Sequence, residues 1–336
     1  MSKILLIGDP HLQFSRFDTA KKFLQWIDEV IDQYKLDLVI NLGDTFHDHG
    51  ILRSQIVSEF SSHVKRITKK IQYIYVLGNH DMSSPRENTY HALQAFKDTY
   101  KNFTVIDSII HREDIGITFV PYLPDHSTFP THTLPICIAH QTFIGCDFGG
   151  YKPEYGVDSN EVSAEIIISG HIHKKQSFGN VFYPGTPYSQ NLKDVGQVKG
   201  VHIFDTGTYK VDFIKSPLPS WHSLSVDITD VKSTISYIEN SINKTDNWII
   251  VFNGPRKEII SLFNSKEWKQ LCQDAHVSTR TNYTDSNKVE RVRINTYTVT
   301  DIFEEYIDKV YTGGLDKDLI KKTTRQLFDN YDKNSV

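Results

Sequence analysis

The sequence of 336 residues contains only three cysteines, Cys137, Cys146 and Cys272, and they are widely spaced. An odd, scattered set of this kind fits neither a disulfide framework nor a zinc-finger spacing. The chain also lacks any apolar run near the ~20 residues that span a bilayer. Its first residues, MSKILLIGDPH, show no signal-peptide cleavage pattern. We therefore expect a protein of the reducing cytoplasm whose cysteines are ordinary core or surface side chains.

An excess of positive charge is missing as well. The formal net charge is −4 and the pI is near 6.4. Proteins that coat nucleic acid nonspecifically are usually basic, so this balance argues against that class. The same charge balance does not exclude a nuclease whose site carries metal cations. Internal repeats and low-complexity tracts are also absent from the sequence, and 39% of residues are hydrophobic, as in an ordinary globular protein.

The first part of the chain alternates between strand-like and helix-like segments. Short apolar runs that end in turn signals predict buried strands at residues 4–9, 37–44 and 72–78. Apolar side chains at helical spacing predict helices at residues 19–34, 53–71 and 87–100. This alternation is typical of parallel strands covered by helices.

The pattern then changes to strands in succession. Strand-like segments follow one another at residues 116–123, 134–143, 164–173, 180–187 and 200–215. Within the last of them, TGT at residues 206–208 predicts a hairpin turn. The fold class predicted for this region is a layered α/β core with two sheets, one of them antiparallel or mixed, flanked by helices.

A linker divides this core from the rest of the chain. SPLPS at residues 216–220 is rich in turn formers, and beyond it strand and helix patterns alternate again as a small α/β unit. Residues 301–331 predict two amphipathic helices broken at Gly313-Gly314. The expected division is therefore a core domain at 1–215, a capping domain at 216–295 and a C-terminal helical segment at 296–336.

Each strand-like run of the core ends in side chains that can bind a metal. The candidate ligands are Asp9, His11, Asp44, Asn79, His140, His171 and His173. A single Asp-x-His or Gly-Asp pair is common by chance, but five such clusters at strand ends are not. In open α/β sheets ligands bind at the carboxyl ends of the strands, so these side chains can converge. Glycines that precede them, Gly43, Gly78 and Gly170, permit tight turns or close backbone approach.

The donor atoms of the candidate ligands limit which metal ions can bind. Two carboxylates, one amide oxygen and four imidazoles, without a thiolate, suit Mn²⁺, Fe²⁺ or Zn²⁺. Seven ligands exceed one tetrahedral site but suit two ions if a carboxylate bridges them. Two ions ~3.5–4 Å apart can hold a shared hydroxide for in-line displacement at phosphorus. His80 remains outside this set, and backed by Asp81 it can steady a phosphate oxygen or protonate the leaving group.

These motifs, in the order D-x-H, G-D, G-N-H-D, H and G-H-x-H, resemble the signature of the calcineurin-like metallophosphoesterases over roughly residues 4 to 175. GDTFHD at residues 43–48 and the segment at 183–205 resemble the SbcD/Mre-eleven nucleases of that family. The helical tail is most similar to bacteriophage members. If the chain is phage-encoded, its location is the host cytoplasm.

The resemblance implies a role for each candidate residue. One metal would be bound by Asp9, His11, Asp44 and His173. The second metal would be bound by Asp44, Asn79, His140 and His171. Asp44 would then bridge the two ions, which the resemblance implies are Mn²⁺.

The resemblance also implies the catalytic residues and the activity. His80 would be the catalytic acid, oriented by Asp81. His47 stands where some members carry a substrate-contacting histidine and others an aspartate, so its role stays open. The implied activity is a 3′-to-5′ exonuclease on duplex DNA and an endonuclease on single strands and hairpins.

Partners follow from the same resemblance. The family partner is a coiled-coil ATPase of the SbcC/Rad-fifty type, which binds the terminal helices. An apolar stripe is available for such docking, or for packing on the cap of the same chain, at Ile307, Val310, Leu319, Leu327 and Phe328. The helices predicted at 53–71 and 87–100 lie where family members form homodimers, although packing on the sheet explains them equally well.

Several residues receive no functional role. Lys174-Lys175 is either a contact to DNA phosphates or a solvated pair. Surface or loop positions are expected for His63, His91, His111, His126, His132, His202, His222 and His276. Two other functions compete with the nuclease: a phosphatase or small-molecule phosphodiesterase with the same two-metal site, and a binding module that has lost catalysis. The complete ligand set argues against the last.

Overall fold

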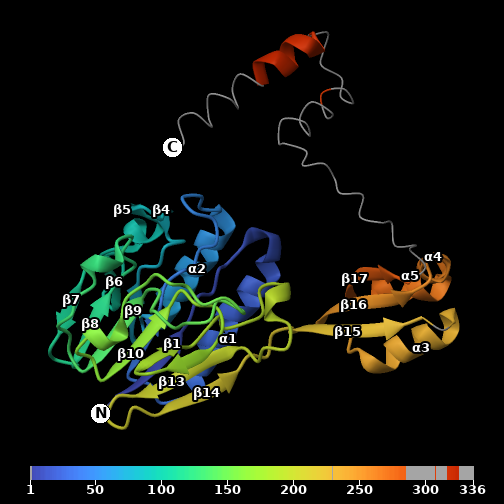
Figure 1. Ribbon diagram of the computed structural model, residues 1–336. Coiled ribbons are helices and arrows are strands. Elements are labelled where there is room, and N and C mark those ends of the chain that lie inside the picture. Colours follow the sequence, from blue (N-terminus) through green and yellow to red (C-terminus); the bar gives the residue numbers. More distant parts are fainter. Residues whose placement is uncertain (1, 229, 285–306, 308–315, 325–336) are drawn as a thin grey trace. The chain divides into compact units, whose positions relative to one another are not determined.

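The computed structural model describes residues 2–228, 230–284, 307 and 316–324 (Figure 1). The chain divides into two compact units, Met1–Asn253 with Glu258–Asn282, and Gly254–Lys257 with Tyr283–Val336. Most described helices and strands belong to the first unit. Within the described residues, no helix is both long enough and apolar enough to cross a membrane.

Six strands form the first sheet, in the order β14-β13-β1-β2-β3-β6. Its strands are β1 (Lys3–Ile7), β2 (Leu38–Asn41), β3 (Gln72–Val76), β6 (Phe103–Ile106), β13 (Gly200–Asp205) and β14 (Val211–Lys215). The first four run parallel to one another, whereas β13 pairs antiparallel with β1 and β14 pairs antiparallel with β13. The predicted hairpin turn between β13 and β14 is confirmed, because the Tyr209 N–H donates to the Asp205 carbonyl across it at 2.8 Å.

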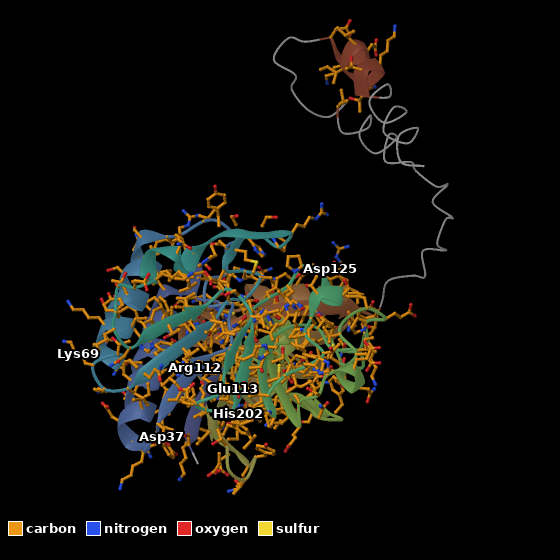
Figure 2. The ribbon with its side chains drawn as sticks, turned by 90° about the vertical axis from the view of Figure 1, so that its left-hand side faces the viewer. Asp37, Lys69, Arg112, Glu113, Asp125 and His202 are labelled. Atoms are coloured by element: carbon orange, nitrogen blue, oxygen red, sulfur yellow. The ribbon has the colours of Figure 1, made fainter. Side chains whose placement is uncertain are left out.

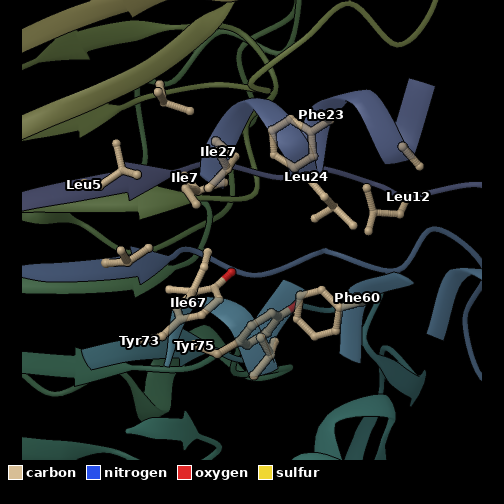
Figure 3. Close-up of a cluster of buried hydrophobic side chains, with 14 of the residues drawn as sticks. Leu5, Ile7, Leu12, Phe23, Leu24, Ile27, Phe60, Ile67, Tyr73 and Tyr75 are labelled. Atoms are coloured by element: carbon tan, nitrogen blue, oxygen red, sulfur yellow. The ribbon is translucent and has the colours of Figure 1, made fainter. Parts of the chain in front are cut away.

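Two helices pack on this sheet, α1 (Phe17–Gln33) and α2 (Ser54–Ile67). Their apolar residues recur at helical spacing, so each helix buries one side. Phe23 and Ile27 of α1 share a core with Leu5 of β1 (Figure 3). Phe60 of α2 packs edge-on against Tyr75 of β3, with ring centroids 6.2 Å apart. The helices predicted over 19–34 and 53–71 are therefore confirmed.

The second sheet also has six strands, in the order β11-β12-β10-β9-β8-β7. They are β7 (Ile110–Arg112), β8 (Ile117–Val120), β9 (Ile136–His140), β10 (Ile166–Gly170), β11 (Gln176–Phe178) and β12 (Val181–Tyr183). The four inner strands are parallel and the two edge strands are antiparallel. Short 3-10 helices in the connections are η1 (Phe14–Arg16), η3 (His126–Thr128), η4 (Ser159–Glu161) and η5 (Leu192–Asp194).

The two sheets pack face to face through alternating residues of β1. Leu5 and Ile7 join the core under the helices, while Ile4 and Leu6 join a second core with Ile138 of β9. A strand buried on both faces must be apolar throughout, which explains the unbroken run in the sequence. The predicted class, a layered α/β core with two sheets, is confirmed, and both sheets prove to be mixed.

The helix predicted over residues 87–100 is wrong. The chain instead forms a hairpin of β4 (Met82–Ser84) and β5 (Glu87–His91), followed by the 3-10 helix η2 (Ala92–Phe96). Leu93 and Phe96 are buried, but their spacing of three suits a 3-10 turn as well as an α-helix. Of the two helices considered for homodimer contacts, only α2 exists.

Two histidines expected at the surface are buried. His63 of α2 contacts the Asp28 carboxylate of α1, with its Nδ1 2.7 Å away. His202 of β13, labelled in Figure 2, lies against the rings of Phe182 and Phe213. Burial lowers the pKa of His202 to about 3, so the ring is neutral and fills apolar space.

A separate sheet follows the linker, in the order β15-β16-β17. Its strands are β15 (Trp221–Asp227), β16 (Asn247–Gly254) and β17 (His276–Tyr283), and its helices are α3 (Val231–Ser241), α4 (Arg256–Asn264) and α5 (Lys266–Asp274). β15 and β16 are parallel and connected through α3. These elements share a core of their own, in which Phe252 packs edge-on against Trp268.

Only part of the C-terminal segment lies among the described residues. Ile307 is helical and buried, and residues 317–324 are helical with Leu319 exposed. Val310, Leu327 and Phe328 of the predicted apolar stripe lie outside the described residues. The division into three domains stays a prediction.

Candidate metal centre

The polar motifs follow the carboxyl ends of five parallel strands from the two packed sheets. Asp9 and His11 follow β1, Asp44 follows β2, and Asn79 follows β3. His140 is the last residue of β9, and His171 and His173 follow β10. Because the two sheets pack face to face, their strand ends meet at one edge of the core. The contacts below bring all seven candidate ligands together there.

The first tight group joins a carboxylate, an amide and two imidazoles. Asp44 Oδ2 lies 3.4 Å from His140 Nε2. The side-chain oxygen of Asn79 lies 3.2 Å from the same His140 nitrogen and 2.8 Å from His171 Nδ1. The ligand atoms of Asp44, His140 and His171 all lie within 4.8 Å of one another, which suits a shared cation.

The second set of ligands lies on the other side of Asp44. His11 Nε2 is 2.9 Å from His173 Nε2 and 3.8 Å from Asp44 Oδ2. Asp9 Oδ1 accepts the backbone N–H of His171 at 2.7 Å. Asp44 Oδ2 is thus close to an imidazole of each set, the position that a bridging carboxylate requires.

Buried polar atoms without hydrogen-bond partners indicate whether a metal ion fits this site. Asp9 Oδ2 and His11 Nδ1 are buried and have no hydrogen-bond partner. A buried carboxylate oxygen without a donor is costly unless a cation or proton satisfies it. The nearby donors are nitrogen and oxygen, and the buried Cys137 and Cys146 lie in a different cluster of apolar residues. The donor set therefore fits hard to borderline divalent ions, and the structure does not identify which one.

Three candidate ligands have strained backbones. His11, Asp44 and His171 have φ angles of 44°, 51° and 82°, in the left-handed region. Such residues cost about 1–3 kcal/mol each and persist only where surrounding contacts fix them. The His11 N–H donates to the Asp44 carbonyl at 2.9 Å. Among the described non-glycine residues, only Asp98 and Tyr209 share this conformation, so the strain is concentrated at the site.

A glycine permits the close approach of the strand ends. A Cβ atom on Gly78 would lie 2.2 Å from Asp44 Oδ1 and 2.8 Å from His140 Cε1. Only glycine leaves room for the carboxylate and imidazole to meet above the β3 backbone. The expected close approach at this residue is therefore confirmed.

The orientation of His140 is fixed from outside the ligand set. Its Nδ1 donates to the carbonyl of Leu42 at 2.5 Å. Because a carbonyl oxygen only accepts, Nδ1 carries a proton and Nε2 is the nitrogen that faces Asp44 and Asn79. This second hydrogen bond places a ligand nitrogen toward the centre of the group.

Burial and charge set the protonation of the metal-free site. Burial acts to raise the pKa of Asp44, but His140 and His11 outweigh it and hold this pKa well below its usual range. Burial acts to lower the pKa of His140, but Asp44 and Asp9 raise it to about 9. Burial and His140 lower the pKa of His171 to about 3. Without metal, the site therefore holds an ionised Asp44 beside a protonated His140.

His80 is beside the ligands and has its own supports. Its Nδ1 donates to the carbonyl of His47 at 2.7 Å, and its backbone N–H donates to Asp44 Oδ1 at 2.7 Å. Its ring stacks on His49, with centroids 4.1 Å apart, and meets the edge of His11 at 4.6 Å. Since Nδ1 is occupied, Nε2 is the nitrogen that can exchange a proton with a substrate.

His47 belongs to a second tight group. The ligand atoms of His11, His47 and His80 lie within 4.8 Å of one another. His47 is half-buried, and burial followed by the charge of His80 lowers the pKa of His47. The structure thus brings the two histidines predicted for catalysis next to a predicted metal ligand.

The structure corrects the expected role of Asp81. The hydrogen bonds of the buried Asp81 carboxylate do not come from the ring of the adjacent His80. They come from four other donors. They are the backbone N–H groups of Asp44, Gly78 and Phe46 and the hydroxyl of Tyr75. Asp81 therefore fixes the loops after β2 and β3 and positions His80 through them.

Sequence reasoning missed several supporting residues. His49 was visible only as the second histidine of the run FHDHG. The ring of Tyr122 lies 5.8 Å from that of His171. Lys199 is buried, donates to the His173 carbonyl at 2.9 Å and pairs with Asp194 at 2.7 Å. Lys199 belongs to the segment at 183–205 whose resemblance to nucleases was noted above, and that resemblance was its one signal.

The lysine pair after the last motif is engaged within the chain. Lys174 pairs with Asp147 at 2.5 Å. The ammonium group of Lys175 lies 4.1 Å from the ring centroid of Phe213. Both lysines nevertheless remain exposed to solvent.

We expect Asp81→Asn to destabilise the protein by about 3 kcal/mol or more at about pH 8. Burial and the charge of Asp44 raise the pKa of Asp81 to about 7, so the carboxylate is ionised there, and an amide would lose buried charge-assisted bonds and turn N–H groups toward backbone donors. Tyr75→Phe is the comparison variant: it keeps the ring but removes one donor to Asp81 and the acceptor of the Thr45 N–H. It should cost about 2 kcal/mol. Urea unfolding without added metal measures both, and an Asp81→Asn loss no greater than that of Tyr75→Phe would contradict this role.

We expect metal binding near neutral pH to release about one proton, since the pKa of His140 is raised to about 9 and a ligand nitrogen must be deprotonated. Metal affinity should therefore fall as pH falls below that value, by about tenfold per pH unit for one proton. Calorimetric titration of Mn²⁺ in two buffers of different ionisation enthalpy measures the released proton. Equal apparent enthalpies in both buffers would contradict the expectation.

Comparisons with known proteins find both sequence relatives and solved structures that resemble this chain. The protein designated phosphoesterase 244L of Invertebrate iridescent virus 6 is 29% identical over 199 residues, 55% of this chain and 69% of that protein. Exonuclease subunit 1 of Enterobacteria phage T4 is 23% identical over 277 residues, 72% of this chain and 81% of that protein. The solved structure of an archaeal phosphodiesterase shares 14% identity with this chain, with a TM-score of 0.34, and the match covers 64% of this chain and 99% of that one. The solved structure of the Pseudomonas putida nuclease MPE also shares 14% identity, with a TM-score of 0.32, and the match covers 63% of this chain and 87% of that one.

The family assignment follows from the part of the chain that carries the site. Residues 2–175 match the family model described as calcineurin-like phosphoesterase. This span is just over half of the 336 residues and includes all seven candidate ligands together with His80. The chain belongs to the calcineurin-like phosphoesterase family.

Proposed function

We propose that this protein is a metal-dependent DNA nuclease subunit of the SbcD type. The observation that carries the proposal is the convergence of the six other candidate ligands around Asp44, with His80 beside them. Exonuclease subunit 1 of phage T4 supports the nuclease reading. Its match covers 72% of the chain, which is more than the phosphoesterase span at residues 2–175.

In this proposal the ligands divide into two sets that share Asp44. One set is Asp9, His11, Asp44 and His173. The other set is Asp44, Asn79, His140 and His171. When bound, two divalent ions, Mn²⁺ in this proposal, supply positive charge for the phosphate and activate water for in-line attack at phosphorus.

The residues of the chain then orient the substrate and move a proton. His80 presents Nε2 toward the site because its Nδ1 is held by the His47 carbonyl. We assign the protonation of the leaving oxygen to that nitrogen. The stacked ring of His49 limits rotation of the acid, and Asp81 keeps the loop of Asp44 in place. His47 contacts the substrate beside them.

The remaining segments receive roles by the same proposal. Residues 1–215 form the nuclease domain, 216–295 a cap that contacts DNA, and 296–336 the segment that binds a coiled-coil ATPase of the SbcC type. The name of the phage T4 relative, a subunit, supports an assembly with a second protein. We further propose a homodimer formed through α2, 3′-to-5′ exonuclease activity on duplex DNA, and endonuclease activity on single strands.

A second candidate keeps the site and changes the substrate. The viral relative at 29% identity is designated a phosphoesterase, a name that specifies no nucleic-acid substrate, and the net charge of −4 gives no general attraction for DNA. A phosphatase or small-molecule phosphodiesterase with the same two-metal site is consistent with both observations.

The deciding experiment is digestion of end-labelled linear duplex DNA with Mn²⁺, with Mg²⁺ or with EDTA. We expect digestion with Mn²⁺ and none with EDTA, and an increase when the ATPase encoded nearby is added. If DNA stays intact under every condition while a small phosphodiester is cleaved rapidly, the second candidate replaces the first.

We expect His80→Ala to retain both metals and to lose cleavage by about 10²–10⁴-fold, the usual contribution of a general acid. Asp44→Ala is the contrasting variant and should lose both metals, because Asp44 faces an imidazole of each ligand set. Metal content by mass spectrometry and cleavage rates are measured on the same samples. Loss of metal from His80→Ala would make His80 a ligand, and a full two-metal complement in Asp44→Ala would exclude the bridge.

A further inference from the structure

The loop that follows β9 exposes an unusual amount of aromatic surface. Between residues 143 and 157, the side chains of Phe148, Tyr151 and Tyr155 are 40%, 58% and 57% exposed, and Ile144 is 46% exposed. A single exposed apolar residue needs no explanation, but several on one short loop do. These residues are not required for the core, which the flanking Phe143 and Val157 already join.

The loop is held rigidly in this position. Asp147 Oδ1 accepts the N–H groups of Gly149 and Gly150 at 2.7 and 2.6 Å. Across the turn, the Phe148 N–H donates to the Tyr151 carbonyl at 2.8 Å. Gln176 accepts the Asp147 N–H at 2.7 Å and donates to the Asp147 carbonyl at 2.9 Å. The exposed rings are therefore presented by a fixed scaffold.

Phe148 also borders the metal ligands. Its ring centroid lies 6.2 Å from that of His171, at an interplanar angle of 84°. Both residues line a cavity of about 240 Å³ whose lining also includes His173, Asn191 and Lys193. The cavity thus combines an aromatic ring, two predicted metal ligands and charged side chains of both signs, the acidic ones being Asp147 and Asp194.

We propose that Phe148 stacks on the base of an unpaired nucleotide next to the scissile phosphate. This inference rests on the nuclease function proposed above and specifies the substrate strand at the site. An aromatic ring next to a phosphate-cleaving centre suits a nucleobase, since every base has a π-face and stacking tolerates any sequence. Lys193, which lines the same cavity, would contact a neighbouring phosphate of the same strand.

The geometry favours an unpaired nucleotide over paired DNA. A base inside a duplex has both faces covered by its neighbours, so it can meet Phe148 only after leaving the stack, and a terminal pair leaves only its outer face open. A protein segment is a poorer occupant, because the cavity opens directly on His171 and His173 and a docked partner there would block the site. In this proposal the substrate at the cavity is an unpaired nucleotide of a frayed end or a single strand.

The test uses a 5′-labelled single-stranded oligonucleotide with Mn²⁺, in which product length identifies the bond that is cut. An abasic residue is then placed on either side of that bond. We expect removal of one of the two bases to lower kcat/KM of the wild-type protein about tenfold, within the range for loss of one stacked base. Phe148→Ala should lose about tenfold on the normal strand and become insensitive to that same base.

Two further variants separate stacking from other effects. Phe148→Trp keeps a larger π-face and should retain wild-type rates and discrimination. Ile144→Ala removes an equally exposed side chain of the same loop that does not line the cavity, and it should behave like the wild type. Since Phe148 is exposed, none of these changes depends on refolding the core.

The outcomes test the stacking role of Phe148 separately from the proposed nuclease function. A wild-type protein that cuts no DNA with Mn²⁺ overturns the nuclease function and the inference with it. A wild-type protein that cuts DNA, combined with a Phe148→Ala variant that still discriminates the abasic strand, overturns only the stacking role. An equal loss by Phe148→Ala on the normal and both abasic strands also overturns it, because that result marks a disturbed His171.

Discussion

The site depends on a buried contact between a carboxylate of one sheet and an imidazole of the other. Asp44 follows β2, His140 ends β9, and their nearest atoms are 3.4 Å apart. Burial alone acts against the charged form of either group, yet each offsets the cost for its neighbour. The pKa of Asp44 therefore stays well below its usual range, and that of His140 rises to about 9. The pair joins the two sheets at the edge where the other ligands converge.

Maintaining that contact constrains the surrounding backbone. Asp44 adopts a left-handed conformation, and the space next to it is open because residue 78 has no side chain. Asp81 then accepts the N–H groups of Asp44 itself and of Phe46. Strain of this kind is retained where it serves a site, since a relaxed loop would point the carboxylate elsewhere. In the two ligand sets proposed above, one cation would take the place of the His140 proton and the other would satisfy the partnerless oxygen of Asp9, so metal binding and local folding would be coupled.

The sequence allowed the prediction of the layered fold and of the side chains that converge at the strand ends, because both depend on short periodic patterns. Apolar runs that end in Asp, His or Asn mark strand ends, and strand ends meet at one edge. The role of Asp81 could not be predicted in the same way, since its donors come from residues up to 37 positions away. The helix predicted at 87–100 was wrong because a spacing of three between apolar residues suits both an α-helix and a 3-10 helix. The surface position predicted for His202 was wrong because nothing in the sequence around a lone histidine indicates the two aromatic rings that cover it.

The composition of the chain also bears on how it would hold DNA. With a net charge of −4, it cannot rely on general attraction between lysines and phosphates, the usual source of affinity and of steep salt dependence. Lys174 and Lys175, the basic pair nearest the last motif, are already engaged with Asp147 and Phe213. In the proposed nuclease, affinity at the site would come from cations held by the ligands, from Lys193 at the cavity and from stacking on an exposed ring such as Phe148. These sources act on a short stretch of strand, and stacking requires a base whose face is not covered by a neighbour in the duplex. On this proposal the chain would recognise an opened end of DNA better than its uninterrupted length.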